Sequence, residues 1–334
     1  MKLTDAVKGY LLSRKMNCSD KTVEWYRQKL AHFCMVLQQE YEVTMLDEVT
    51  VTHLRLFVEL MKGTKANANN PNKPTKDDTT VSDLTVKGYV QVIKGFFNWC
   101  VKEELITKNP VLKLENPKVG KYVIKTFSSD QVRMMLEACN THTMIGFRDY
   151  TIILLLLDTG IRVSELCGLT LDRVYLEVMN DAFIKVLGKG RKEREVGVSS
   201  DVAQYLWKYI HQHRHAKDDK NQTLFINLFG ENLTIYGVEQ MLEEVEKRAG
   251  ITGVRVSPHT FRHTFARMFL ENGGEVYKLS LILGHSSVLV TENYLKDFVS
   301  REARQGQSKH SPVSSLNLGK QNNGFKKKVQ KWGD

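Results

Sequence analysis

Several features common in other classes of protein are missing from this 334-residue sequence. It has no run of about 18 apolar residues, which excludes a transmembrane helix; its densest stretch is Thr151–Leu157. Its five cysteines are scattered and form no Cys-x-x-Cys pair, so we expect neither a disulfide framework nor a zinc site. The first residues lack the apolar segment of a signal peptide. These absences favour a soluble protein of a reducing cytoplasm, without membrane contact.

The charge of the chain is positive and unevenly distributed. The sequence has 48 lysines and arginines against 38 acidic residues, a net charge of +10. Residues 1–118 carry a net charge of +4, residues 119–300 are neutral, and residues 301–334 carry +6. Any basic protein must place its charges somewhere, but an excess at both ends favours a polyanionic partner such as nucleic acid.

The apolar pattern predicts a helical first domain over residues 1–110. Apolar residues recur at helical spacing through residues 4–60 and again through residues 86–100. Residues 63–83 separate these two stretches and are rich in Asn, Lys, Thr, Pro and Asp. Such a composition has too few apolar side chains to pack a core, so we expect a mobile loop there.

A second domain is predicted over residues 126–300. Two Asn-Pro pairs precede it and favour an interdomain linker over residues 111–125, because the residue before proline leaves the helical region. Segments rich in Val, Ile and Phe at 182–187 and 194–198 predict a β hairpin with a basic tip. The polar residues 301–334 predict a mobile basic tail. Helices are expected over residues 151–157, 203–210, 238–249, 259–271, 276–283 and 287–299.

Five short segments of the second domain contain side chains suited to phosphoryl transfer. Two arginines can each donate a forked pair of hydrogen bonds to phosphate oxygens. Two histidines can exchange protons near neutral pH. A lysine between two glycines can donate a proton from a flexible turn, and a tyrosine hydroxyl can act as a covalent nucleophile. In chain order these residues are Arg162, Lys189, His259, Arg262, His285 and Tyr294.

Each of these residues alone has an ordinary structural interpretation. An arginine three residues before Glu165 is typical of a surface ion pair, and a Gly-Lys-Gly sequence is typical of a hairpin tip. The combination is more specific. Arg262 lies three residues after His259, on the same face of a helix, and Tyr294 follows His285 by nine residues.

This order of residues resembles the tyrosine recombinases, or phage-type integrases, the family of the Xer recombinases, lambda integrase and Cre. The resemblance extends over residues 3–300 and is most specific over residues 155–295. It implies a fold that is mainly α with a small β-sheet. A helical, SAM-like core-binding domain and an α+β catalytic domain would form a C-shaped clamp around DNA.

The resemblance also implies a role for each matching residue that holds the phosphate. Arg162 and Arg262 would clamp the scissile phosphate, and His285 would donate a hydrogen bond to one of its oxygens. Glu165 and His263 match the family pattern as well and would support the site without reacting.

The remaining matches would carry the bond-breaking chemistry. Tyr294 would be the nucleophile, His259 would assist its proton transfer, and Lys189 would protonate the leaving 5′ oxygen. Two fixed arginines can neutralise the charge of the transition state, so the resemblance implies no metal, ATP or cofactor.

The implied activity is site-specific DNA recombination, by which a mobile element is integrated or excised. It would proceed through a 3′-phosphotyrosine intermediate and a Holliday junction. The expected partners are double-stranded DNA with an inverted-repeat core site and a homotetramer assembled on two such sites. An accessory DNA-bending or directionality factor is also expected, in a bacterial cytoplasm at the nucleoid. The tail, residues 301–334, would dock on a neighbouring subunit or contact DNA.

Two other functions are compatible with these residues. A type IB topoisomerase uses the same classes of side chain and would relax DNA with little site preference. A DNA-binding accessory protein without catalytic activity would be expected to lack at least one of the six reacting residues, and all six are present. The lysine hairpin and the sequence Leu283-Gly284-His285 favour the recombinase.

Overall fold

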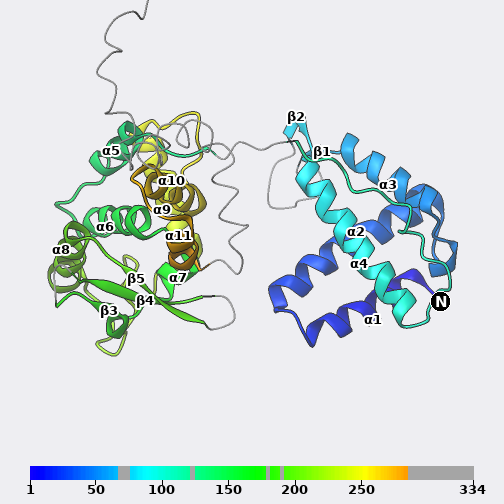
Figure 1. Cartoon of the computed structure of the whole chain (residues 1–334), viewed down its shortest axis with the longest axis horizontal. Helices are drawn as coiled ribbons and strands as arrows, with labels where there is room; N and C mark the ends of the chain where they lie inside the picture. Colours follow the sequence, from blue (N-terminus) through cyan, green and yellow to red (C-terminus); the bar gives the residue numbers. More distant parts are fainter. Residues whose placement is uncertain (67–75, 121–124, 178–180, 189–191, 285–334) are drawn as a thin grey trace, which may run out of the picture. The chain divides into compact units, whose positions relative to one another are not determined.

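The computed structural model divides the chain into two compact units, Met1–Tyr122 and Val123–Asp334 (Figure 1). Among the helices it describes, none combines the length and apolar character that a bilayer span requires. The described residues are 1–66, 76–120, 125–177, 181–188 and 192–284.

The first unit is helical, as the sequence predicts. α4 packs against α1, α2 and α3, and their apolar faces enclose one core. Ser19, Thr50 and Ser82 begin three of these helices, and each side chain accepts a hydrogen bond from the backbone amide three residues later. The elements are α1 (Leu3–Lys15), α2 (Asp20–Tyr41), the short 3₁₀ helix η1 (Leu46–Glu48), α3 (Val51–Gly63) and α4 (Asp83–Lys102).

The prediction of a loop throughout residues 63–83 is wrong at both ends of that segment. β1 (Lys65–Ala66) pairs antiparallel with β2 (Lys76–Thr80). The prediction relied on the scarcity of apolar residues, but the hydrogen bonds between strands join backbone groups and need no apolar side chain. Residues 67–75 lie outside the described residues.

The predicted linker over residues 111–125 begins inside the first unit. Val111 and Leu114 are buried in its core, and the Asn109 side chain accepts a hydrogen bond from the Val111 amide. The linker interpretation is therefore wrong for residues 111–114. An irregular segment can still bury its apolar side chains, and the proline pattern indicates only where a helix ends.

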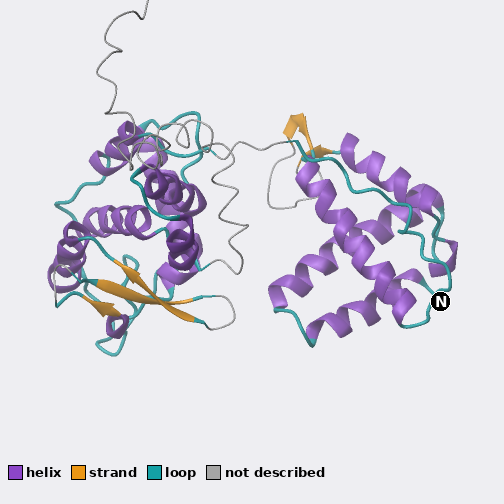
Figure 2. Ribbon diagram, viewed as in Figure 1, coloured by secondary structure: helices purple, strands orange, loops and turns teal. Residues whose placement is uncertain are grey.

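The second unit is mainly helical with a three-stranded antiparallel sheet in the order β3-β4-β5 (Figure 2). The predicted hairpin is confirmed as β4 (Phe183–Leu187) and β5 (Glu193–Gly197), in which Leu187 lies opposite Glu193. The short strand β3 (Val174–Tyr175) was not predicted. The helices are α5 (Ser129–Glu137), α6 (Met144–Thr159), α7 (Val163–Cys167), η2 (Leu171–Arg173), α8 (Ser200–Lys208), the π-helix η4 (Tyr209–His213), α9 (Ile235–Ala249), α10 (Pro258–Glu271) and α11 (Val276–Leu283).

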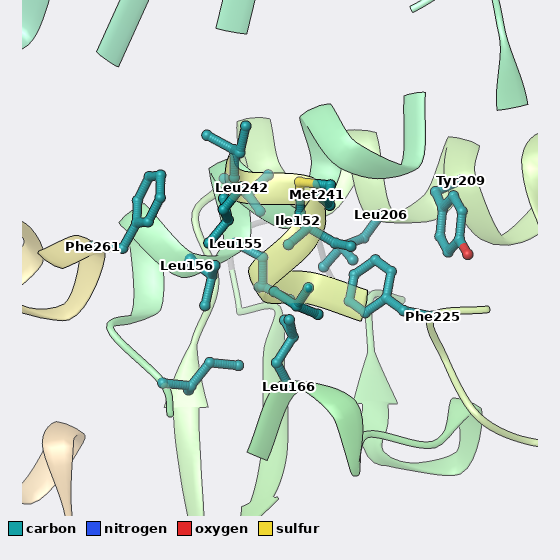
Figure 3. Packing of buried hydrophobic residues seen from close by; sticks show 14 of the residues in the cluster. Ile152, Leu155, Leu156, Leu166, Leu206, Tyr209, Phe225, Met241, Leu242 and Phe261 are labelled. Carbon is teal, nitrogen blue, oxygen red and sulfur yellow. The ribbon is translucent and has the colours of Figure 1, made fainter. Parts of the chain in front are cut away.

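Helix α6 lies at the centre of the second unit and packs against α8 and α10. Its residues 151–156 are apolar on almost every face, which is typical of a buried helix and confirms that prediction. Figure 3 shows Leu155 and Leu156 in one cluster with Leu206 of α8 and Phe261 of α10. This packing fixes where α6 ends relative to α10, and the candidate site lies at that end.

The remaining helix predictions divide into two groups. The helices expected over residues 203–210, 238–249, 259–271 and 276–283 are confirmed, with α8 ending two residues early and a π-helix following it. The helix expected over residues 287–299 and the tail, residues 301–334, lie outside the described residues.

Candidate active site

The turn that presents Arg162 depends on Gly160. Gly160 ends α6 with φ of 59°, in the left-handed region that glycine adopts without steric cost. A Cβ atom at this position would collide with the Phe265 ring of α10. Glycine therefore allows α6 and α10 to approach closely, and the chain turns so that Arg162 begins α7 two residues later.

Glu165 holds Arg162 at both its backbone and its side chain. The Arg162 backbone amide donates to Glu165 Oε2 at 2.8 Å, and Arg162 Nη1 donates to Glu165 Oε1 at 3.0 Å. Arg162 Nη2 also donates to the Gly284 carbonyl at 3.2 Å. The Arg162 side chain is 32% exposed, so its guanidinium is fixed in place and still accessible to a ligand.

Arg262 is buried within α10 and joins the ends of two other helices. Its Nη1 donates to the Gly160 carbonyl at 2.8 Å and its Nη2 to the Leu283 carbonyl at 2.6 Å. Carbonyls in the last turn of a helix have no partner within the helix, so a cationic donor satisfies them well. The guanidinium plane is therefore set by the ends of α6 and α11.

The two predicted arginines come together at the end of α11. The carbonyls that they contact belong to Leu283 and Gly284, which are consecutive residues. Arg162 and Arg262 are 100 residues apart in the sequence, so only the fold brings them together. Two guanidinium groups at one point form a strongly cationic site, suited to an anion such as a phosphate diester.

Two of the predicted histidines, His259 and His263, lie in the first two turns of α10. Ser257 caps the helix by accepting a hydrogen bond from the Thr260 amide, and His259 follows in the first turn as an exposed side chain. His263 lies one turn later and is half-buried. Burial, with the nearby His259 and Arg262, lowers the pKa of His263 to about 4, so its ring is neutral at neutral pH.

Glu165 is a buried carboxylate that two arginines neutralise. Burial by itself raises the pKa of Glu165, but hydrogen bonds and charges from Arg194 and Arg162 outweigh it and hold that pKa below its ordinary value. The Glu165 side chain is only 2% exposed. It therefore remains ionised at neutral pH and holds both arginines.

Arg194 of β5 also belongs to this cluster, although it was not among the predicted site residues. Its Nη1 and Nη2 donate to Glu165 Oε1 and Oε2 at 2.8 and 2.9 Å, and its Nε donates to the Ile282 carbonyl at 2.6 Å. One signal was present in the sequence. Arg194 is two residues before the buried Val196, on the same face of the strand, and an arginine on an inward face indicates a buried ion pair.

Two family models match the chain. The model of the phage integrase family matches residues 125–301, and the model of the phage integrase SAM-like domain matches residues 2–118. The chain belongs to the phage integrase family. The resemblance to tyrosine recombinases is thus confirmed, as is the predicted combination of a SAM-like helical domain with a mainly helical catalytic domain.

The curated relatives of this recombinase include several called tyrosine recombinase XerD. The protein of Oceanobacillus iheyensis is 28% identical over 304 residues, which cover 90% of this chain and 96% of the relative. The protein of Listeria monocytogenes is 30% identical over 254 residues, covering 72% and 84%. The chain is a tyrosine recombinase, an enzyme of site-specific DNA breakage and rejoining.

Solved structures share the fold of this recombinase. The Tn1549 transposon integrase in complex with a circular intermediate DNA has a TM-score of 0.72 and 20% identity, covering 93% of this chain and 100% of that one. A lambda integrase dimer bound to a core site has a TM-score of 0.64 and 15% identity, covering 87% and 97%.

Three predicted residues of the recombinase lie outside the described residues: Lys189, His285 and Tyr294. Two of their sequence neighbours are described and lie at the arginine site. Gly284 precedes His285 and accepts the bond from Arg162. Gly188 precedes Lys189, and a Cβ atom on Gly188 would lie 3.7 Å from Glu165 Oε1.

Proposed function

We propose that this recombinase cuts DNA through a covalent 3′-phosphotyrosine at Tyr294, without metal or ATP, to integrate or excise a mobile element. The observation that supports this proposal is the meeting of Arg162 and Arg262 on consecutive carbonyls of α11. A scissile phosphate bound by both guanidinium groups would adjoin the segment that continues to His285 and Tyr294.

The two arginines lower the electrostatic barrier to cleavage of the phosphate diester. A phosphate diester is an anion that repels nucleophiles, and in the transition state the negative charge is spread over the equatorial oxygens of the phosphoryl group. Guanidinium groups already held by Glu165 and by helix-end carbonyls need little reorganisation as that charge develops. We assign them the task that metal ions perform in other phosphoryl-transfer enzymes.

The protons move in two steps during cleavage. A tyrosine has a pKa of about 10, so only about 0.1% is phenolate at neutral pH, and His259 takes the proton as Tyr294 attacks phosphorus. The new bond joins the Tyr294 oxygen to phosphorus, and the bond from phosphorus to the 5′ oxygen breaks. Lys189 gives a proton to that leaving oxygen, while His285 donates a hydrogen bond to a nonbridging oxygen.

Rejoining reverses these steps with a different DNA end. A free 5′ hydroxyl of another duplex attacks the phosphotyrosine, a new phosphodiester forms, and Tyr294 leaves as a phenol. The phosphotyrosine retains the energy of the broken bond, so strand exchange through a Holliday junction requires no external energy source. Glu165 and His263 support the site without exchanging protons with DNA.

The assembly we propose follows the family resemblance. Residues 1–114 form the core-binding domain, residues 126–300 the catalytic domain, and the two clamp double-stranded DNA. A homotetramer acts on two inverted-repeat sites in the bacterial cytoplasm at the nucleoid, with an accessory DNA-bending or directionality factor. The basic tail, residues 301–334, contacts a neighbouring subunit or DNA phosphates.

A covalent-capture selection tests the function and finds the site. Wild type and Tyr294→Phe are incubated, with EDTA present, with nicked duplexes from the flanks of the gene's genomic locus. Protein-linked DNA is recovered after SDS and sequenced. We expect wild type to capture one inverted-repeat site and Tyr294→Phe to bind that site without capture. Capture by the Phe variant would exclude Tyr294 as nucleophile, and efficient capture without sequence preference would favour a topoisomerase.

The role of Lys189 as general acid is tested with a second, modified DNA substrate. Lys189→Ala is expected to cleave ordinary DNA slowly and to recover on DNA with a sulfur in place of the leaving 5′ oxygen, because a thiolate leaves without protonation. An equal defect on both substrates would remove Lys189 from that role.

A further inference from the structure

We propose that Arg194 is a positioning residue of the recombinase, which sets the orientation of Arg162 through Glu165 and holds the end of α11 in place. This inference rests on the proposed function, because the position of Arg162 matters for cleavage only if Arg162 binds the scissile phosphate. Arg194 lies on β5, five residues after Lys189 in the sequence.

Arg194 makes a forked ion pair with a buried partner. Its two terminal nitrogens each contact a different oxygen of Glu165, at 2.8 and 2.9 Å. The side chains are 14% and 2% exposed, so water screens this pair little. A bidentate pair fixes both planes, and Glu165 in turn bonds the backbone and side chain of Arg162.

The end of α11 is bound by three arginines in sequence order. The carbonyls of Ile282, Leu283 and Gly284 accept hydrogen bonds from Arg194, Arg262 and Arg162 respectively. These carbonyls form the negative end of the helix and lack partners within it, so cations stabilise them. Figure 1 shows α11 beside the sheet that contains β5, and α7 beside the same sheet.

Gly284 fits closely against Arg194. Its φ is 62°, and a Cβ atom there would lie 3.0 Å from Arg194 Cζ. The glycine thus lets the chain pass directly over the guanidinium before it continues to His285. Each of the three side-chain nitrogens of Arg194 donates to a protein acceptor, so Arg194 acts through Glu165 and α11.

The test compares Arg194→Ala and Arg194→Lys with a matched control, Arg173→Ala. Arg173 pairs with Glu193 on the same hairpin at 3.0 Å, and among the described residues no hydrogen bond or ion pair joins it to Glu165 or α11. The substrate is the nicked duplex that wild type captures. Readouts are the single-turnover rate of covalent complex formation, the dissociation constant for DNA and the melting temperature of the second unit.

We expect both Arg194 variants to bind DNA as wild type does and to form the covalent complex about 100-fold more slowly, the cost of a small misplacement of a reacting group. Arg194→Lys keeps the positive charge but cannot make the bidentate pair with Glu165. Its melting temperature should therefore be closer to that of wild type than the melting temperature of Arg194→Ala, while its cleavage rate stays low. Arg173→Ala should cleave at the wild-type rate. Cleavage by Arg194→Lys at the wild-type rate would overturn the proposal.

A double-mutant cycle with Glu165→Gln separates positioning from general structural support. If Arg194 acts through Glu165, adding Arg194→Ala to Glu165→Gln should slow cleavage much less than it slows wild type. Equal factors in both backgrounds would show that Arg194 does not act through Glu165.

A protein-only measurement keeps this inference distinct from the proposed function. Hydrogen exchange in the peptide Val276–Gly284 should be faster in Arg194→Ala than in Arg173→Ala, whether or not any DNA is cleaved. Unchanged exchange would overturn the role at α11. Failure of wild type to capture DNA, with faster exchange in Arg194→Ala, would overturn the proposed function and support the Arg194 contacts.

Discussion

Arg262 Nη1 lies 2.8 Å from the carbonyl oxygen of Gly160, and this hydrogen bond joins residues that are 102 positions apart. It connects the middle of α10 to the residue that ends α6. Arg162 begins α7 only two residues after Gly160. The bond from Arg262 therefore also holds the turn that presents Arg162, the second predicted phosphate-binding arginine. Each arginine therefore depends on the position of the other.

Arg262→Lys tests this dependence. A lysine has one terminal nitrogen and cannot reach the Gly160 and Leu283 carbonyls with the spacing of a guanidinium. Leaving one buried carbonyl unpaired should cost about 1–3 kcal/mol of folding stability. We expect covalent capture to fall by roughly 100-fold. Urea unfolding and the capture assay measure the two effects, and an unchanged capture rate would contradict the assignment.

We predict that the difference in folding stability between wild type and Glu165→Gln depends on pH. The pKa of Glu165 is lowered in the folded protein, so the unfolded chain takes up a proton first as the pH falls. Its contribution is full above the unfolded pKa of about 4.3 and is lost as the pH falls through the folded pKa. Urea unfolding should show Glu165→Gln about 1–3 kcal/mol less stable at neutral pH, and the gap should narrow in acid.

We predict that His263 makes folding stability depend on pH in a second, less acidic range. Its pKa is lowered to about 4 in the folded protein, against 6.5 ordinarily. Between these values the unfolded chain binds a proton that the folded protein does not, so folding stability decreases as the pH falls through this window. His263→Gln does not titrate and should lose less stability there. Urea titrations across this window measure the difference, and equal losses of stability in wild type and His263→Gln would contradict it.

We predict that Gly284→Ala slows covalent capture of DNA and that Gly250→Ala does not. Both glycines have a left-handed backbone, with φ of 62° and 64°. The strain of alanine should therefore be similar at each, about 1–2 kcal/mol. Only at Gly284 does the added Cβ press on Arg194, whereas Gly250 faces open space. We expect slow covalent capture for Gly284→Ala alone; equal rates in the two variants would show that the contact with Arg194 is unimportant.

The sequence predicted α10, α11 and the buried part of α6 because their apolar patterns are local. The run around Leu155 marks the buried helix, and helical spacing marks residues 259–271 and 276–283. The five-residue helix α7, which carries Glu165, is too short to show that spacing and was not predicted. The loop prediction over residues 63–83 failed because strand pairing there depends on backbone groups, which composition does not report.

The residues of the site differed in how well the sequence could predict them. Arg162, Glu165 and Arg262 were found because they belong to a pattern with fixed order and spacing. Arg194 was missed because its partners are Glu165, 29 residues away, and Ile282, 88 residues away. No local spacing links these positions, and only the packing of β5 against α11 brings them together.

Within the part of the chain that the structure describes, the buried apolar residues form clusters that each stay within one unit. The cluster from Leu3 to Leu114 belongs to the first unit, and the clusters around α6 and α10 belong to the second. Cooperative melting requires a shared core, so a calorimetric trace should resolve two transitions, and one melting temperature does not describe the chain. Substitutions at Arg194, Glu165 or Arg262 then identify the two transitions. The transition whose temperature they change is the melting of the catalytic unit.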